Sequence, residues 1–300
     1  MTTRREFIHS TLAGLIAASA PSGLTAAQMS GTGPKTPAID APIGLQLYSL
    51  RHLFKKGDVA GTLAMVKEWG ITHVELAGTY GMSSTDFAAL LKKIGLQAVS
   101  THADFNKLAT EPDAVSADAK TFGVEYVGCA WIPHDEKEKF GAADAEKALK
   151  VFNAAGAKAK EAGLRFFYHI HGYEFQPAPG GGTFFDTIAK GTDPSLVAFE
   201  MDVFWAVRGG ANPVALFTTY PGRFELTHLK DMQKGLPVGD PTGHAPDTTN
   251  VPLGTGQIDW TSVLREANRQ KVKYHFIEDE HPQSEEQIPQ SLQYLATLKL

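Results

Sequence analysis

The sequence predicts a (β/α)8 barrel, an α/β fold in which eight parallel strands close into a ring of crossover helices. Three observations lead to this prediction. Short apolar or β-branched runs alternate with stretches of helical period along residues 42–300. Four glycines, Gly70, Gly95, Gly123 and Gly163, each stand between a helical stretch and the next apolar run, where a left-handed residue ends a helix. The length also fits, because about 250 residues is typical of a single closed barrel.

The expected strands are eight short apolar runs, each a few residues long. They are Ile43–Tyr48, His73–Leu76, Gln97–His102, Tyr126–Ala130, Arg165–Ile170, Val197–Met201, Glu225–Leu229 and Tyr274–Glu278. An open, doubly wound sheet is the rival architecture. Such a sheet usually has a glycine-rich phosphate turn after its first strand, and residues 45–53 contain no such turn.

Amphipathic stretches between these runs predict the helices. They are Val59–Trp69, Ser84–Ile94, Ala142–Ala162, Pro213–Thr219, Trp260–Arg269 and Glu285–Leu298. Asp58, Ser84 and Asp259 stand where a side-chain oxygen would cap a helix N-terminus. The stretch 234–252 is long for a connection between strand and helix, and we expect it to form a lid over a substrate.

Composition limits the classes of function. The chain has 300 residues, 43% of them hydrophobic, and a formal net charge of -5. A nucleic-acid-binding protein would normally carry a basic face, so this balance argues against one. Cys129 is the single cysteine, which excludes an internal disulfide and a thiolate zinc cluster. Small, uncharged ligands are therefore favoured.

The first residues predict a targeting signal that is not part of the fold. Arg4 and Arg5 precede a short run of small apolar residues and then Ala26 and Ala27, an order that resembles a twin-arginine export signal. The run is too short and too alanine-rich for a stable membrane anchor. We therefore expect a signal peptide at 1–27, a flexible connector at 28–41 and one catalytic barrel at 42–300. The mature protein would be periplasmic or secreted, with the export machinery as a partner.

Polar side chains gather at the expected strand ends, where barrel enzymes carry their chemistry. The acids and histidines there are Glu75, His102, His169, His171, Glu200, Asp202, His228 and Glu278. Lys230 also stands at one of these strand ends. Each alone has a structural explanation, such as a helix cap or a buried histidine. Together they would place several carboxylates in one cavity, which is costly without a cation. Oxygen and nitrogen donors of this kind suit one divalent ion, Mn²⁺, Mg²⁺, Co²⁺ or Zn²⁺.

Five motifs in this order resemble the sugar phosphate isomerase/epimerase family, whose fold is a xylose-isomerase-like barrel. They are YHIHGYEF at 168–175, EMDVFW at 200–205, HLKD at 228–231, GTGQIDW at 254–260 and FIED at 276–279. The resemblance covers residue 43 to the C-terminus. It implies a single divalent metal held by Glu174, Asp202, His228 and Glu278, with His171 as the alternative to Glu174.

The resemblance also implies a mechanism. The metal binds a sugar carbonyl and a neighbouring hydroxyl, and so stabilises the enediolate left when the adjoining carbon loses its proton. Glu174 and Glu278 would act as acid and base, assisted by Lys230 and His102. Substrate-binding side chains would be His169, His171, Glu75, Trp205 and Trp131, the two indoles packing against the sugar ring.

Several reactions begin with the same proton removal, so the outcome stays open at this point. An isomerase or epimerase of an unphosphorylated sugar or keto-sugar is the first hypothesis, since export and the lack of a basic cluster both disfavour sugar phosphates. A lyase or hydrolase of 3-keto-glycosides is the alternative. A non-catalytic periplasmic sugar-binding barrel comes third, and an apurinic endonuclease is weaker still. A homo-oligomer is compatible with all of them.

Overall fold

The computed structural model describes residues 38–135 and 139–300. The expected signal peptide and residues 28–37 of the connector lie outside the described residues. Within those ranges eight parallel strands close into a barrel, because β1 pairs with both β2 and β10. The predicted (β/α)8 barrel is thus confirmed. Its strands are β1 (Ile43–Gln46), β2 (His73–Leu76), β3 (Gln97–His102), β4 (Tyr126–Cys129), β5 (Arg165–His169), β6 (Val197–Asp202), β7 (Phe224–Leu229) and β10 (Tyr274–Ile277).

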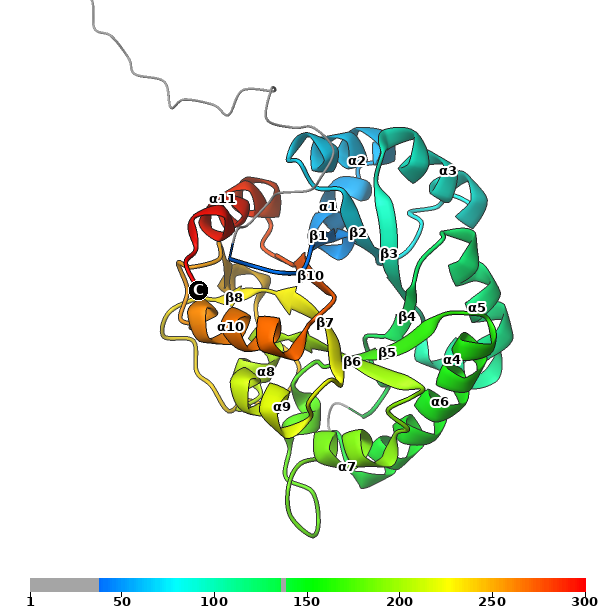
Figure 1. Cartoon of the computed structure of the whole chain (residues 1–300), viewed down its shortest axis with the longest axis vertical. Helices are drawn as coiled ribbons and strands as arrows, with labels where there is room; N and C mark the ends of the chain where they lie inside the picture. The colour runs from blue at the N-terminus through cyan, green and yellow to red at the C-terminus, as the bar shows by residue number, and fades with distance from the viewer. Residues whose placement is uncertain (1–37, 136–138) are drawn as a thin grey trace, which may run out of the picture. The chain divides into compact units, whose positions relative to one another are not determined.

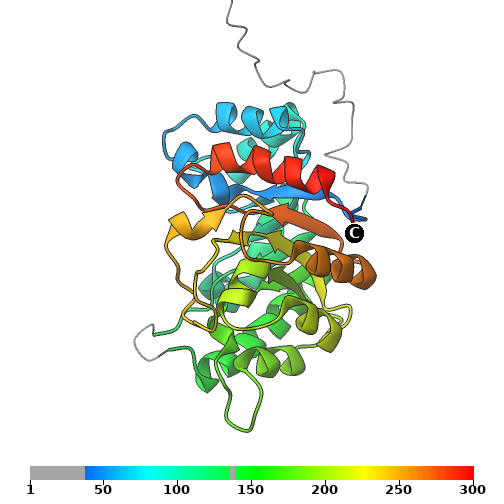
Figure 2. The ribbon, with the colours of Figure 1, turned by 90° about the vertical axis from the view of Figure 1, so that its left-hand side faces the viewer.

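Helices surround this ring of strands (Figure 1). The longer ones are α2 (Val59–Glu68), α3 (Ser84–Ile94), α5 (Pro112–Thr121), α6 (Ala142–Glu161), α10 (Trp260–Gln270) and α11 (Ser284–Thr297). Figure 2 shows α11, in red, between α2 and α10, so the last helix of the chain completes the ring beside the first. In the part of the chain that the structure describes, no helix has the length and apolar character needed to cross a membrane.

The six predicted helices are present with ends shifted by at most one or two residues. One of the predicted helices is α9 (Pro213–Thr219). The prediction missed the longer helix α5 and four shorter helices, α1 (Arg51–Phe54), α4 (Phe105–Thr110), α7 (Phe184–Gly191) and α8 (Val203–Arg208). Asp58 and Asp259 cap their helices as predicted. The prediction for Ser84 was wrong, because Ser83 accepts the bond from the Asp86 amide and caps α3. The four glycines expected after helices all have positive φ.

The barrel interior is filled below the strand ends by an apolar cluster. It consists of Val99, Tyr126, Phe167, Ala198, Leu226 and Phe276, with Tyr274 packed against it. Gly44 and Gly128 make room for two of these rings, since a Cβ at Gly128 would lie 2.5 Å from Phe167 and one at Gly44 would lie 2.8 Å from Phe276. Side chains two residues apart on a strand share a face. For several members of this cluster, the residue two positions later therefore also points into the barrel, one layer closer to the C-terminal ends of the strands. That layer carries the polar residues of the site.

Candidate functional site

A cavity of about 860 Å³ opens at the C-terminal ends of the strands. Its lining combines three kinds of side chain. The carboxylates are Asp104, Asp247, Glu278 and Glu280, the imidazoles are His102, His169, His171 and His244, and the large aromatic residues are Tyr48, Trp131 and Trp205. Arg and Lys are absent from the lining contributed by the described residues. The cavity is therefore lined mainly by acidic, imidazole and aromatic side chains.

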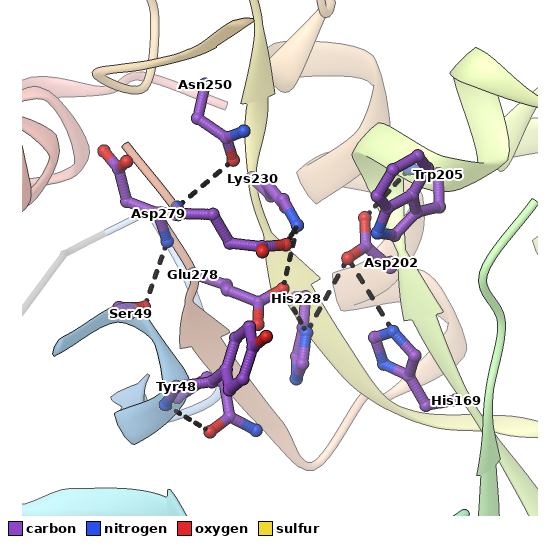
Figure 3. Close-up of polar contacts among 12 residues, drawn as sticks. Tyr48, Ser49, His169, Asp202, Trp205, His228, Lys230, Asn250, Glu278 and Asp279 are labelled. Atoms are coloured by element: carbon purple, nitrogen blue, oxygen red, sulfur yellow. Dashed lines mark hydrogen bonds and ion pairs between the residues drawn. The ribbon is translucent and has the colours of Figure 1, made fainter. Parts of the chain in front are cut away.

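Three of the four expected metal ligands converge beside this cavity, which Glu278 lines, whereas Asp202 and His228 are fully buried. Asp202, His228 and Glu278 each offer a ligand atom within 4.8 Å of the others. His228 Nδ1 lies 3.1 Å from Glu278 Oε2 and 3.7 Å from Asp202 Oδ2 (Figure 3). These side chains end β6 and β7 or directly follow β10, so the barrel brings together residues from three neighbouring strands.

Asp202 leaves one oxygen without a partner. Its Oδ1 accepts the Trp205 amide at 2.9 Å and so caps α8, whereas Oδ2 is buried with no hydrogen-bond partner among the described residues. An unpaired buried carboxylate oxygen is costly. A divalent cation bound by this oxygen and by the nitrogen and oxygen of its two neighbours would remove that cost. The donor set thus fits the metal that the sequence led us to expect.

The fourth donor near this point comes from β5, and it is His169. His169 Nε2 lies 3.9 Å from Asp202 Oδ2. Glu174 belongs to neither of the potential metal-binding groups found in the described residues. Its Oε1 accepts the His171 amide at 2.9 Å, and its Oε2 has no partner there. Of the β5 side chains, His169 is thus the one with a nitrogen beside Asp202, whereas the expected candidates, Glu174 and His171, stay predictions as metal ligands.

Glu174 lies in a turn, η3 (Tyr173–Phe175), where its side chain is fully buried. Burial raises its pKa to about 7, although the backbone amides of Glu174, His171 and Gly172 and the Tyr168 hydroxyl act in the opposite direction. It does not line the cavity. Glu278 lines the cavity and Glu174 does not, so the proton transfer that the two were expected to share stays a prediction.

A second layer of charged groups lies under the metal-facing atoms. Glu75 Oε1 is 2.6 Å from His228 Nε2, and Glu200 Oε2 is 3.0 Å from His169 Nδ1. His102 Nε2 lies between the two carboxylates, 3.1 Å from Glu75 and 3.4 Å from Glu200. Burial alone would lower the pKa of His102, but the two carboxylates raise it to about 10. Glu75, expected to bind substrate, is fully buried and does not line the cavity.

Lys230 is buried beside two glutamates. Its Nζ lies 3.3 Å from Glu278 Oε2 and also pairs with Glu280 Oε1. Burial would lower the pKa of this ammonium, but the two carboxylates raise it above its usual value, so the lysine stays charged. The same ammonium lies over the indole of Trp205, 5.1 Å from the ring centroid. Lys230 therefore helps to hold the same Glu278 oxygen that lies beside His228 Nδ1.

Aromatic rings form one wall of the cavity. The His171 ring stacks on Trp205, and Trp131 contacts His171 edge-on with centroids 5.0 Å apart. His171 Nδ1 is buried without a hydrogen-bond partner among the described residues, and burial lowers the pKa of the ring well below its usual value. His171 is therefore a neutral imidazole beside the cavity. Both indoles predicted to pack against substrate do line this space.

The long stretch 234–252 reaches over the mouth and is tied down at two points. It contains η4 (Asp247–Thr249) and β9 (Asn250–Val251), and β9 pairs with β8 (Asp231–Met232), which precedes the stretch. Arg51 binds Asp247 at 2.7 Å, and Arg208 pairs with Asp240. Between these ties, residues 243–245 line the cavity. This segment is placed where the expected lid would cover a substrate.

Two residues near the strand ends have roles that their position in the sequence did not reveal. Asp231 is structural, because its carboxylate accepts bonds from the Gly254 and Gly256 amides and from the Trp260 indole. Glu200 was expected only as one of the acids gathered at the strand ends, yet it contacts three histidines of the site. The signal for Glu200 is its spacing, since it stands two residues before Asp202 and so shares the inward face of β6.

Comparisons with known proteins agree with this architecture. A sugar phosphate isomerase/epimerase of Parabacteroides distasonis ATCC 8503 is 27% identical, covering 85% of this chain and 98% of that one with a TM-score of 0.72. An inosose dehydratase of Geobacillus kaustophilus (strain HTA426) is 25% identical over 57% of this chain, which spans 61% of that relative's length. The IOLI protein, solved with a bound zinc atom, is 14% identical with a TM-score of 0.59, covering 85% and 94% of the two chains, and shares the fold.

A family model connects these relatives. The xylose isomerase-like TIM barrel family matches residues 63–298, which include seven of the eight barrel strands and the converging group Asp202, His228 and Glu278. The chain belongs to the xylose isomerase-like TIM barrel family.

Proposed function

We propose that this chain is a divalent-metal-dependent isomerase or epimerase of an unphosphorylated sugar or keto-sugar. One observation carries the proposal: Asp202, His228 and Glu278 converge beside an acidic, aromatic cavity, with an unpaired carboxylate oxygen at their centre. His169 completes the donor set. Zinc in the IOLI protein supports a metal in a barrel of this fold, and we leave the identity of the ion to experiment.

A bound divalent ion would polarise a substrate carbonyl and make the neighbouring C–H bond more acidic. The protein supplies the rest. Glu278 lines the cavity with its Oε2 fixed between His228 and Lys230, so it is our candidate to take the proton. The Glu174 carboxylate accepts a hydrogen bond from the His171 backbone amide and does not line the cavity. We therefore assign the second acid/base role, beside that of Glu278, to the neutral His171 ring. Trp131 and Trp205 would hold the apolar face of the sugar.

The lining of the cavity supports an uncharged substrate. Binding of a phosphoryl group normally uses Arg, Lys or a helix N-terminus aimed at the ligand. Asp104, Asp247, Glu278 and Glu280 line the cavity, while the nearby cations Lys230 and Arg51 are each paired with carboxylates. A phosphorylated sugar would meet net negative charge there. Competition between a sugar and its phosphate for the metal-loaded protein tests this part, and tighter binding of the phosphate would contradict it.

Deuterium exchange tests the reaction. Protein loaded with Mn²⁺ or Zn²⁺ is incubated in heavy water with unphosphorylated ketoses, inososes and 3-keto-glycosides, and the products are followed by mass spectrometry. An epimerase leaves solvent deuterium in the recovered sugar. Glu278→Gln should abolish exchange, and exchange at the wild-type rate in this variant would show that Glu278 is not the base.

Elimination is the second candidate, and a specific observation favours it. The relative from Geobacillus kaustophilus is a dehydratase, and both dehydration and cleavage of a 3-keto-glycoside begin with the same proton removal. The experiment above separates these outcomes. Loss of water from an inosose indicates a dehydratase, whereas release of the aglycone from a 3-keto-glycoside indicates a lyase. A metal-free protein that binds sugar without any turnover would favour a binding protein.

Export remains part of the proposal. The Arg4–Arg5 pair and the alanines at 26 and 27 support a twin-arginine signal and a periplasmic or secreted protein. Replacing both arginines by lysine should keep the precursor in the cytoplasm, as fractionation and immunoblotting would show. Normal export of that double variant would contradict the proposed signal.

A further inference from the structure

Two buried glutamates lie directly behind the imidazoles that face the proposed metal. We propose that Glu75 and Glu200 are positioning residues, which hold His228 and His169 in the orientation and tautomer that metal binding requires. The inference rests on the proposed metal site. It adds two residues that do not touch the metal or line the cavity, from strands β2 and β6.

The two edges of the His228 ring face different partners. Nδ1 faces the metal-binding group, 3.1 Å from Glu278 Oε2 and 3.7 Å from Asp202 Oδ2. Nε2 lies 2.6 Å from Glu75 Oε1. A neutral imidazole carries its proton on one nitrogen only. Donation from Nε2 to Glu75 therefore leaves the Nδ1 lone pair free for a metal.

His169 repeats this arrangement with the nitrogens exchanged. Its Nδ1 lies 3.0 Å from Glu200 Oε2, and its Nε2 faces Asp202 Oδ2 at 3.9 Å. A proton held on Nδ1 by Glu200 leaves Nε2 free. The two rings lie close together, with centroids 4.5 Å apart, so both free nitrogens face the unpaired oxygen of Asp202. A carboxylate behind a metal-binding histidine fixes its tautomer and makes it a stronger donor.

Glu75 is itself held on both oxygens, whereas Glu200 is held through Oε2, and its buried Oε1 has no hydrogen-bond partner among the described residues. Glu75 accepts from Gln46 Nε2 at 2.6 Å and from Ser100 Oγ at 2.5 Å. Both carboxylates are fully buried, and His102 lies between them within 3.4 Å of each. Carboxylates fixed in this way cannot turn toward solvent when a metal binds or leaves. The support for the two imidazoles is therefore preformed.

The same atoms suggest a competing explanation, a second ion in the deeper layer. His102, His169, Glu200 and His228 offer ligand atoms within 4.8 Å of one another. However, each of the three imidazoles already hydrogen-bonds one of the two glutamates, at distances of 2.6, 3.0 and 3.4 Å. A second ion would need the histidine nitrogens that already face the two glutamates.

Zinc affinity tests the inference without use of catalytic activity. Glu75→Gln and Glu200→Gln preserve side-chain shape and remove the charge. We expect each to weaken zinc binding by about 10- to 100-fold in competition with a chromogenic chelator. Glu225→Gln is the matched control, because Glu225 also bonds two side chains, Arg165 and Tyr126, but stands near the start of β7, and its zinc affinity should equal that of the wild type. Cobalt-loaded variants should also show a shifted visible absorption spectrum, because the donor strength of the imidazole has changed.

The outcomes are distinct. Wild-type zinc affinity in both variants, or two zinc ions per wild-type chain, would overturn the inference. Thermal unfolding of the metal-free variants identifies any that fail to fold, and Glu75→Asp and Glu200→Asp then replace them, with an intermediate affinity expected. If zinc binding weakens as expected but no sugar is turned over, the proposed function fails and this inference stands. If turnover is present and both variants bind zinc normally, the reverse holds.

Discussion

The imidazole of His171 stacks on the indole of Trp205, with ring centroids 4.5 Å apart and planes inclined by 23°. This pair forms a rigid part of the cavity wall between β5 and α8. The Trp205 backbone amide also binds Asp202 Oδ1, so one residue contributes both to the substrate wall and to the support of the metal-binding group. Substitution of its side chain separates the two contributions.

Trp205→Ala should raise KM for the sugar identified in the exchange experiment by about 2- to 10-fold, because this is the loss of affinity expected when one aromatic contact is removed. Metal content should not change, because the alanine retains the backbone amide that binds Asp202. Trp205→Phe should restore most of the loss, since a ring again lies against His171. Steady-state kinetics and metal analysis check this prediction. A variant that loses its metal but keeps its KM would contradict the assignment.

Asp202→Asn should remove metal binding without loss of the fold. The asparagine oxygen still accepts the Trp205 amide, so the cap of α8 is retained, but the unpaired negative oxygen is gone. A ligand at a thousand times its Kd stabilises a protein by about 4 kcal/mol. Thermal unfolding of the wild type should therefore shift upward on addition of Mn²⁺ or Zn²⁺, and that of Asp202→Asn should not.

Asp104→Asn is the control for this variant. Asp104 also caps a helix, through the Lys107 amide, and lines the cavity, but it is not one of the metal-binding group. Its metal-induced shift should match that of the wild type. An equal loss in both variants would show that the shift reports the charge of the cavity and not Asp202 as a ligand.

The sequence could predict the barrel because alternation and glycine stops are local signals, and it could predict that Asp202, His228 and Glu278 lie close together because a barrel brings consecutive strand ends together. It could not predict which side chain after β5 lies beside this group. Glu174 stands five residues after His169, and only the turn at 173–175 shows that its carboxylate folds back onto the His171 amide. The position of the acid in the sequence gave no sign of this turn.

The role of Glu75 could not be predicted for a different reason. It depends on a contact with His228, which is 153 positions away in the sequence, and on the register that places both side chains in one layer of the interior. Strand alternation predicts that such a residue points inward, but not which partner it meets across the barrel. Its burial at a strand end therefore suggested contact with substrate, whereas the structure shows a contact with a histidine.

Lys230→Met should destabilise the metal-free protein by about 3 kcal/mol, because it leaves the buried Glu278 and its neighbour Glu280 without their shared cation. Addition of Glu280→Gln to this variant removes one of the two stranded charges and should recover part of the loss. Urea unfolding of both single variants and the double variant measures the coupling, which should exceed about 1 kcal/mol for groups in contact. Additive effects would show that the lysine and the glutamate do not interact.

Glu174→Gln should make the metal-free protein more stable at pH 8 than the wild type. Burial raises the folded-state pKa of Glu174 to about 7 from its ordinary value of 4.5, so the folded protein binds the proton more tightly than the unfolded chain. That contribution to stability is fully present below pH 4.5 and is lost as the pH rises through 7, at a cost of roughly 3 kcal/mol. Glutamine keeps the oxygen that accepts the His171 amide and carries no charge at any pH.

Urea unfolding at pH 5 and pH 8 in the presence of a chelator checks this prediction, with the exposed Glu146→Gln as the control that should show no such pH-dependent gain.

Glu174→Gln also decides between His169 and Glu174 as the β5 metal ligand. If His169 is the ligand, Glu174→Gln binds zinc as the wild type does and gains stability only at the higher pH. If Glu174 is the ligand, its zinc affinity falls sharply, because the substitution removes a charged donor from the metal site.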